Sequence, residues 1–109
     1  MNDKDEAYIK DILAMIAEIE KTISGLSYES FVQNMTAFRA VERNFEIIGE
    51  AVKRLSPDFT KNYPEVPWTE IAGFRDILVH DYASVNTLTV WDTLQQDIPK
   101  LKVVLQKSV

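Results

Sequence analysis

The chain has 109 residues, of which 46% are hydrophobic and 27% charged, a composition typical of one soluble globular domain. It contains no cysteine, which excludes a disulfide scaffold, and its net charge of −5 argues against generic coating of nucleic acid by a basic surface. No apolar run approaches the roughly 20 residues of a membrane span, and the N-terminus lacks the pattern of a signal peptide. We therefore expect residues 1–109 to form a single cytoplasmic domain.

The first segment predicts an amphipathic helix, because its apolar residues recur every three or four positions. These residues are Ile9, Ile12, Leu13, Ile16, Ile19 and Ile23. Gly25 is a natural stop for this helix, and Ser27 is a candidate N-cap for the next element. We expect a short helical turn over Tyr28–Val32.

A second long helix is predicted from Met35 to Leu55, again from apolar residues three or four positions apart. Ser56-Pro57 ends it, because the residue before a proline is pushed out of the helical region. The segment from Ser56 to Pro67 is interpreted as a connector that includes one helical turn near Pro57–Lys61.

Pro67 suits the first position of a further helix, which would carry Trp68 and extend into the region of His80. Asn86 is a candidate cap for a last helix that runs past Pro99, where we expect a kink or shifted hydrogen bonding. Five aromatic residues at core spacing are interpreted as packing: Phe38, Phe45, Trp68, Phe74 and Trp91. The pattern predicts an all-α, up-and-down four-helix bundle with short extra helices.

His80 is the only histidine of the chain, so any imidazole chemistry runs through this residue or through two copies of it in a dimer. On a helix, Asp76 and His80 share a face, where a carboxylate can hold the imidazole N–H. Arg75 and Tyr82 share another face. About 140° separates Arg75 from His80 on a straight helix, which favours a composite site at a two-fold interface.

These residue types fit cleavage of RNA without a metal. The 2′-hydroxyl of RNA can attack the neighbouring phosphate when a base such as His80 removes its proton. The guanidinium of Arg75 can stabilise the charge that develops on phosphate, and Tyr82 can orient that group. The alternative is that His80 caps a helix or is simply the hydrogen-bonded partner of Asp76.

The second helix also carries a polar stripe. Arg39 and Arg43 lie within about 60° of Glu46 and Glu50 at helical pitch. The two arginines are candidate RNA-phosphate contacts on the wall of a groove. The alternative is an exposed face joined by ion pairs such as Arg43–Glu46.

Three blocks of the chain resemble the HepT-like proteins of the HEPN superfamily. Arg75–Tyr82 is similar to the family's R-x4-H-x-Y signature. Phe45–Pro57 resembles its second-helix block, and Tyr63–Phe74 resembles the block that leads into the signature. The blocks occur in the family's order and extend over nearly the whole chain.

The resemblance implies a homodimeric, helical toxin of a toxin–antitoxin pair with metal-independent endoribonuclease activity and no cofactor. Arg75 and His80 of both protomers would be catalytic at the dimer cleft, with Asp76 and Tyr82 in support. The implied partner is a minimal nucleotidyltransferase antitoxin that transfers AMP from ATP to Tyr82 and silences the toxin. Asp76 stands where the wider superfamily often has asparagine.

The sequence is also compatible with two other functions. The chain could be a non-catalytic module that binds a nucleotidyltransferase, which its acidic charge and Asp76 favour. It could also be a purely structural dimerisation bundle, in which Tyr82 is never modified.

Overall fold

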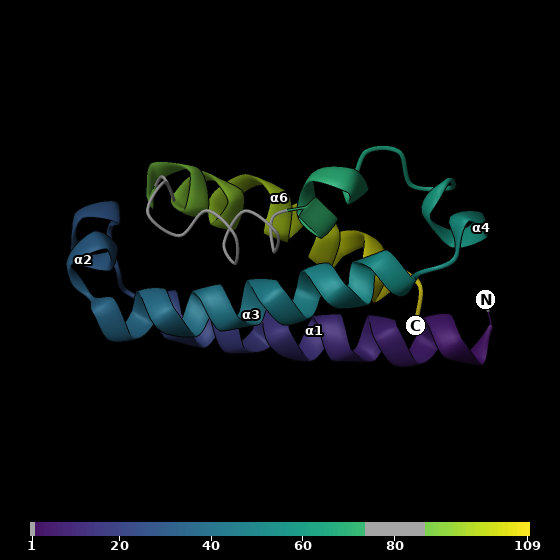
Figure 1. Cartoon of the computed structure of the whole chain (residues 1–109), viewed down its shortest axis with the longest axis horizontal. Coiled ribbons are helices and arrows are strands. Elements are labelled where there is room, and N and C mark those ends of the chain that lie inside the picture. The colour runs from purple at the N-terminus through teal and green to yellow at the C-terminus, as the bar shows by residue number, and fades with distance from the viewer. Residues whose placement is uncertain (1, 74–86) are drawn as a thin grey trace.

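The computed structural model describes residues 2–73 and 87–109, and every regular element within these residues is α-helical (Figure 1). In chain order the elements are α1 (Asp3–Ile23), α2 (Tyr28–Gln33), α3 (Met35–Arg54), α4 (Pro57–Thr60), a helical segment at 68–73, and α6 (Thr87–Lys107). The all-α class is thereby confirmed. The four-helix bundle and the homodimer stay predictions.

An asparagine side chain caps the start of α1, and a glycine follows its end. The side chain of Asn2 accepts a hydrogen bond from the Asp5 backbone N–H at the start of the helix. After Ile23 the chain turns at Gly25, whose φ of 78° lies in the left-handed region that glycine adopts without strain. The predicted glycine stop is confirmed.

Two polar residues delimit α2. Ser27 caps it through a reciprocal capping box with Ser30, which confirms the predicted N-cap. Asn34 ends α2 and begins α3, since its side chain accepts from the backbone N–H of Ala37. Asn34 is therefore both the C-cap of α2 and the N-cap of α3.

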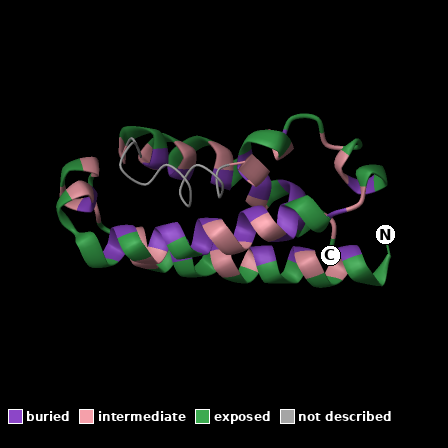
Figure 2. Ribbon diagram, viewed as in Figure 1, coloured by how far each residue is buried: buried purple, intermediate pink, exposed green. Residues whose placement is uncertain are grey.

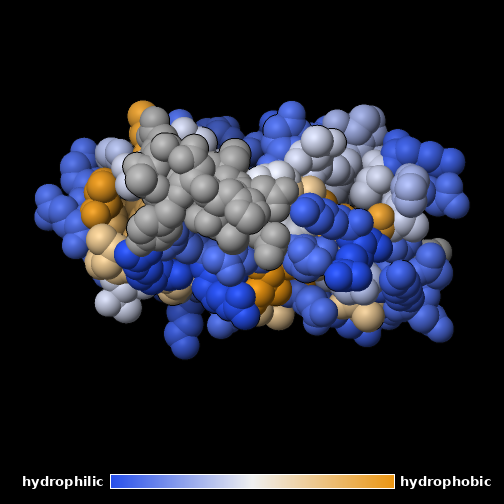
Figure 3. Space-filling view, in the orientation of Figure 1, coloured by the Kyte–Doolittle hydropathy of each residue, from blue (hydrophilic) through white to orange (hydrophobic). Residues whose placement is uncertain are grey.

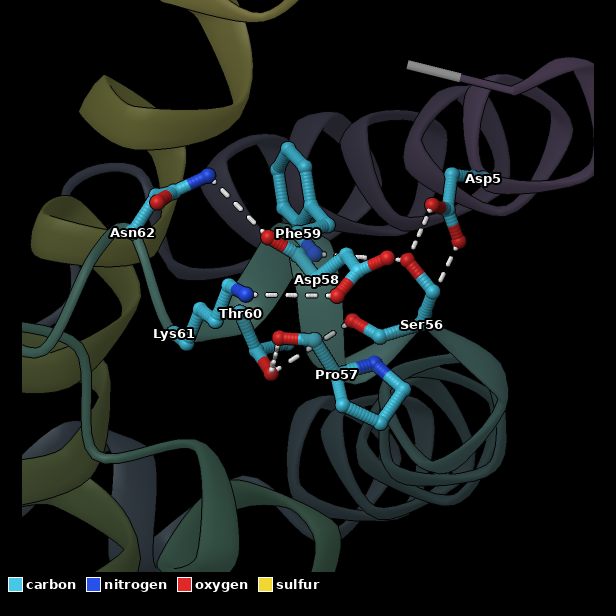
Figure 4. A network of polar contacts seen from close by, with 8 residues as sticks. All are labelled: Asp5, Ser56, Pro57, Asp58, Phe59, Thr60, Lys61 and Asn62. Atoms are coloured by element: carbon cyan, nitrogen blue, oxygen red, sulfur yellow. Dashed lines mark hydrogen bonds and ion pairs between the residues drawn. The ribbon is translucent and has the colours of Figure 1, made fainter.

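A buried carboxylate joins the start of α1 to the end of α3. Leu55 is the C-cap of α3, and Ser56 caps α4, which has Pro57 in its first turn. The carboxylate of Asp5, 3% exposed, accepts from the Ser56 backbone N–H at 2.9 Å and from its hydroxyl at 2.6 Å (Figure 4). These bonds bring together residues 51 positions apart.

The helices α1 and α3 lie side by side and antiparallel. The apolar stripe of α1 packs against α3, and the buried residues of α3 follow its whole length (Figure 2). From α1, the core takes Ile9, Ile12, Ile16 and Ile19, all four fully or almost fully buried. The periodicity of the sequence therefore predicts the correct faces of both helices.

Aromatic packing joins α2 to α3 and α6. Phe31 is fully buried, with ring centroids 5.7 Å from Phe38 and 5.2 Å from Trp91. Phe38 and Phe45 are buried, while Trp68 and Trp91 pack against the core as partly buried rings. This confirms the packing interpretation for these four residues. Phe74, the fifth, lies outside the described residues.

Three smaller predictions concern Pro67, Pro99 and Asn86. The helical segment at 68–73 begins one residue later than expected, because the carbonyl of Pro67 accepts the first helical hydrogen bond, from Ile71 N–H at 3.0 Å. Pro67 is therefore the residue before the helix. The helix α6 continues through Pro99. The predicted cap at Asn86 lies outside the described residues.

Within residues 2–73 and 87–109, none of the helices combines the length and the apolar character needed to cross a membrane.

Candidate functional site

The four residues of the predicted catalytic motif lie outside the part of the chain that the structure describes. They are Arg75, Asp76, His80 and Tyr82. Their predicted roles and their mutual geometry therefore stay predictions. The described structure instead defines the two flanks of this segment and the polar face of α3.

Both flanks of residues 74–86 are fixed to the core. On the N-terminal side, Trp68 donates its indole N–H to the carbonyl of Tyr63 at 2.9 Å, and Ile71 is buried. On the C-terminal side, the hydroxyls of Tyr28 and Thr87 lie 3.1 Å apart, which joins α2 to the first residue of α6.

The two predicted phosphate contacts lie on α3, one turn apart, and each forms an ion pair. A guanidinium nitrogen of Arg39 is 2.9 Å from the carboxylate of Glu42, and one of Arg43 is 3.2 Å from that of Glu46. The Arg43–Glu46 pair confirms the ion pair expected from the sequence. Whether the arginines also meet RNA stays a prediction.

Glu42 is a residue that the sequence reasoning missed. Its side chain is only 9% exposed, although it carries a carboxylate. Glu42 lies four residues after Phe38 and three before Phe45, so helical spacing alone places it in the apolar stripe of α3. That position was the signal for an unusually buried acid.

A second missed residue is Asn44, which is 6% exposed at the contact between α3 and α1. Its amide nitrogen lies 3.4 Å from a carboxylate oxygen of Glu18 and 3.5 Å from the sulfur of Met15. Its amide oxygen has no hydrogen-bond partner among the described residues. A buried amide of this kind favours one register between two helices, because a shift would leave more of its polar atoms unpaired.

The polar side of α3 continues into a shallow groove between α1 and α3, with a volume of about 400 Å³. Its polar lining residues are Tyr8, Asp11, Arg43, Glu46, Glu50 and Arg54. Arg54 pairs with Glu50 at 3.0 Å. Figure 3 shows the hydrophilic side chains that gather over α3 on this face. Three carboxylates and two guanidinium groups make the groove slightly acidic.

Among residues 2–73 and 87–109, no group of three or more potential metal ligands comes together.

Comparison with known proteins identifies relatives along almost the full length of the chain. The family model described as "Ribonuclease HepT-like" matches residues 12–108. "Putative RNase TTE0752" of Caldanaerobacter subterraneus subsp. tengcongensis is 42% identical over 105 residues, covering 93% of this chain and 94% of that protein. "Putative RNase MJ0125" of Methanocaldococcus jannaschii is 39% identical, covering 95% and 90%.

A further relative, "Probable ribonuclease HepT" of Thermococcus cleftensis, is 38% identical over 107 residues and covers 98% of this chain and 97% of its own. No solved structure matches the chain. The family match extends over the region of the R-x4-H-x-Y motif and beyond it on both sides. The chain therefore belongs to the HepT-like ribonuclease family, for which RNA is the class of substrate.

Proposed function

We propose that this protein is a metal-independent endoribonuclease that acts as a homodimer, with Arg75 and His80 of both copies in one shared cleft. One observation carries the proposal: the family model matches residues 12–108, and Arg75, His80 and Tyr82 occur in that range at the spacing R-x4-H-x-Y. Because the chain has a single histidine and no cysteine, a second copy is its only source of further imidazole groups.

The reaction uses groups that the RNA itself provides. His80 removes the proton of a 2′-hydroxyl, and the oxygen then attacks the adjacent phosphorus. The bond from phosphorus to the 5′-oxygen breaks, and that oxygen takes up a proton, so the products are a 2′,3′-cyclic phosphate and a 5′-hydroxyl. Arg75 stabilises the negative charge on the phosphate oxygens during this step. Asp76 orients His80, and Tyr82 helps to orient the phosphate.

The same site allows regulation by covalent modification. In the proposal, the protein is the toxin half of a pair whose partner is a minimal nucleotidyltransferase. The phenolic oxygen of Tyr82 attacks the α-phosphorus of ATP, pyrophosphate leaves, and the phenolic proton is released. The added AMP brings bulk and a negative charge near Arg75, where it competes with the phosphate of the substrate.

The first test is cleavage of RNA by the purified protein in excess EDTA. Wild type should cut RNA, while Arg75→Ala and His80→Ala proteins with an unchanged helical spectrum and the same dimeric mass should not. Cleavage at the wild-type rate by both variants would remove the assignment of the site. Intact mass after co-expression with a cognate nucleotidyltransferase tests the modification, which should disappear in Tyr82→Phe.

The net charge of −5 and the acid at Asp76 favour a second candidate, a non-catalytic module that binds the nucleotidyltransferase. Such a protein would form the complex without cutting RNA. Expression of the chain alone separates the two candidates. Growth arrest that disappears with His80→Ala supports the ribonuclease, and normal growth with a stable complex supports the binding module.

A further inference from the structure

Three arginines of α3 form similar ion pairs whose acidic partners differ in burial. Arg39 and Arg54 are matched, with side chains 50% and 54% exposed and partner distances of 2.9 and 3.0 Å. Their carboxylates are not matched, since Glu42 is 9% exposed and Glu50 is 45% exposed. The pair of Arg43 is intermediate, because its carboxylate is 32% exposed.

This difference changes what an approaching anion meets. In the Arg39–Glu42 pair the negative end lies in the apolar stripe of α3, while the positive end faces solvent. The pair is therefore a fixed dipole that points its positive end outward. In the Arg54–Glu50 pair both ends face water, so the two charges cancel at a short distance and are screened by solvent.

Burial of the acid also fixes the base. A carboxylate that has lost most of its water depends on its charged partner, so the bond to Glu42 restricts the positions that the Arg39 guanidinium can take. A guanidinium has five N–H donors in a rigid fork, so a half-exposed one can keep its carboxylate and still donate to a phosphate oxygen. Less side-chain entropy is then lost when RNA binds.

We propose that Arg39 is the residue of α3 that contacts the phosphate backbone of the RNA substrate, with Glu42 as its positioning residue. The inference rests on the proposed ribonuclease function. The more deeply the paired carboxylate is buried, the more its arginine should contribute to RNA binding. We therefore expect Arg39 to contribute most, Arg43 less and Arg54 least. Because the chain carries a net charge of −5, a few fixed contacts matter more than general attraction.

The experiment measures binding apart from cleavage. Full-length protein carrying His80→Ala is titrated into a fluorescein-labelled, single-stranded RNA of mixed sequence, and anisotropy gives Kd at several salt concentrations. Arg39→Gln should raise Kd roughly tenfold, the loss expected for one charge-assisted hydrogen bond. It should also make the salt dependence shallower, by about 0.7 in log–log slope for each Arg39 of the proposed homodimer that contacts the strand.

The matched control is Arg54→Gln, which removes the same charge from the same helix at nearly the same exposure. Kd should change less than about twofold, and Arg43→Gln should fall between the two. Equal losses for Arg39→Gln and Arg54→Gln would overturn the inference, because they would mean that only charge matters. An unchanged Kd for Arg39→Gln would overturn it as well.

Glu42→Gln tests the positioning role through the direction of its effect. The substitution adds one net positive charge, so charge alone predicts tighter binding of RNA. Loss of a positioned guanidinium predicts weaker binding of RNA, and this is the result we expect for Glu42→Gln. The control, Glu50→Gln, should bind RNA as well as the parent protein or better. Tighter binding by Glu42→Gln would contradict the positioning role.

Two further readouts keep the test decisive. If Arg39→Gln loses its helical spectrum, Arg39→Lys takes its place, since lysine keeps the charge but lacks the planar guanidinium. Weaker RNA binding by Arg39→Lys with an unchanged salt slope supports the proposed contact. Binding with the affinity of the parent protein overturns the inference. Cleavage by wild type in EDTA is measured in parallel. When wild type cuts RNA and Arg39→Gln binds like Arg54→Gln, this inference alone fails. When the protein neither binds nor cuts RNA, the proposed function fails with it.

Discussion

The carboxylate of Asp5 should be one of the most sensitive polar groups in the fold. It is 3% exposed and accepts two hydrogen bonds from Ser56, at 2.9 Å from the backbone N–H and at 2.6 Å from the hydroxyl (Figure 4). The perturbation is Asp5→Ala, which removes both acceptor oxygens and leaves the two donors of Ser56 without this partner.

The expected loss follows from these two bonds. A hydrogen bond to a charged acceptor contributes about 1.5–3 kcal/mol. Ser56 is only partly buried, so water replaces part of what is lost. We therefore expect Asp5→Ala to lower the free energy of unfolding by roughly 3 kcal/mol, and Asp5→Asn, which keeps one acceptor oxygen, by about half as much.

Urea denaturation followed by far-UV circular dichroism measures this loss. All proteins are compared at one concentration, because association contributes to apparent stability. The control is Asp58→Ala, in the same region, whose carboxylate is 92% exposed and pairs with Lys61 at 3.3 Å. It should cost about 0.5 kcal/mol or less. If Asp5→Ala costs no more than Asp58→Ala, the link between α1 and the α3–α4 junction does not hold the fold as described.

Two further substitutions test the packing and the turn. Phe31→Ala should lower the free energy of unfolding by about 3–5 kcal/mol in the same urea assay, because the fully buried ring contacts Phe38 and Trp91 and its removal leaves a cavity. A loss below about 1 kcal/mol would mean that α2 is not packed as described. Gly25→Ala should lower the free energy of unfolding by about 1 kcal/mol, because the φ of 78° is strained for alanine. A new Cβ would meet no atom within 4 Å, so backbone strain is the only expected contribution. A larger loss would show a steric clash that this geometry does not contain.

The parts of the fold that the sequence predicts correctly depend on local patterns. The isoleucines of α1 recur at helical spacing, and the glycine at position 25 and the serine at position 27 mark boundaries through their own backbone and side-chain chemistry. Such signals act over a few residues and need no knowledge of the tertiary structure. For this reason the predicted buried face and C-terminal stop of α1, and the predicted N-cap of α2, agree with the structure.

The polar contacts between distant segments were not predictable in the same way. Asp5 and Ser56 are 51 positions apart, and no periodicity indicates that a carboxylate in the first turn of α1 holds the junction after α3. Glu42 was missed for a related reason. Charged residues are assigned to the exposed face by default, and only its place between Phe38 and Phe45 shows that it lies on the buried one.

For the candidate site, the sequence provides the identities of the residues and their order, and the family match extends over the segment that contains them. In the proposed homodimer, the distance between Arg75 of one copy and His80 of the other would depend on how the copies meet, which no spacing along one chain determines. The described structure adds information on α3 that the sequence motif lacks. It shows which carboxylates the α3 arginines pair with and how far these carboxylates are buried.

The chemical ends of the RNA fragments released in excess EDTA test the central claim most directly. If His80 activates the 2′-hydroxyl, wild type should leave 2′,3′-cyclic phosphates and 5′-hydroxyls, and folded His80→Ala protein should release no fragments. RNA that carries 2′-O-methyl groups should not be cut. Fragments with 3′-hydroxyls and 5′-phosphates, or an unchanged rate of cleavage by His80→Ala, would contradict the account.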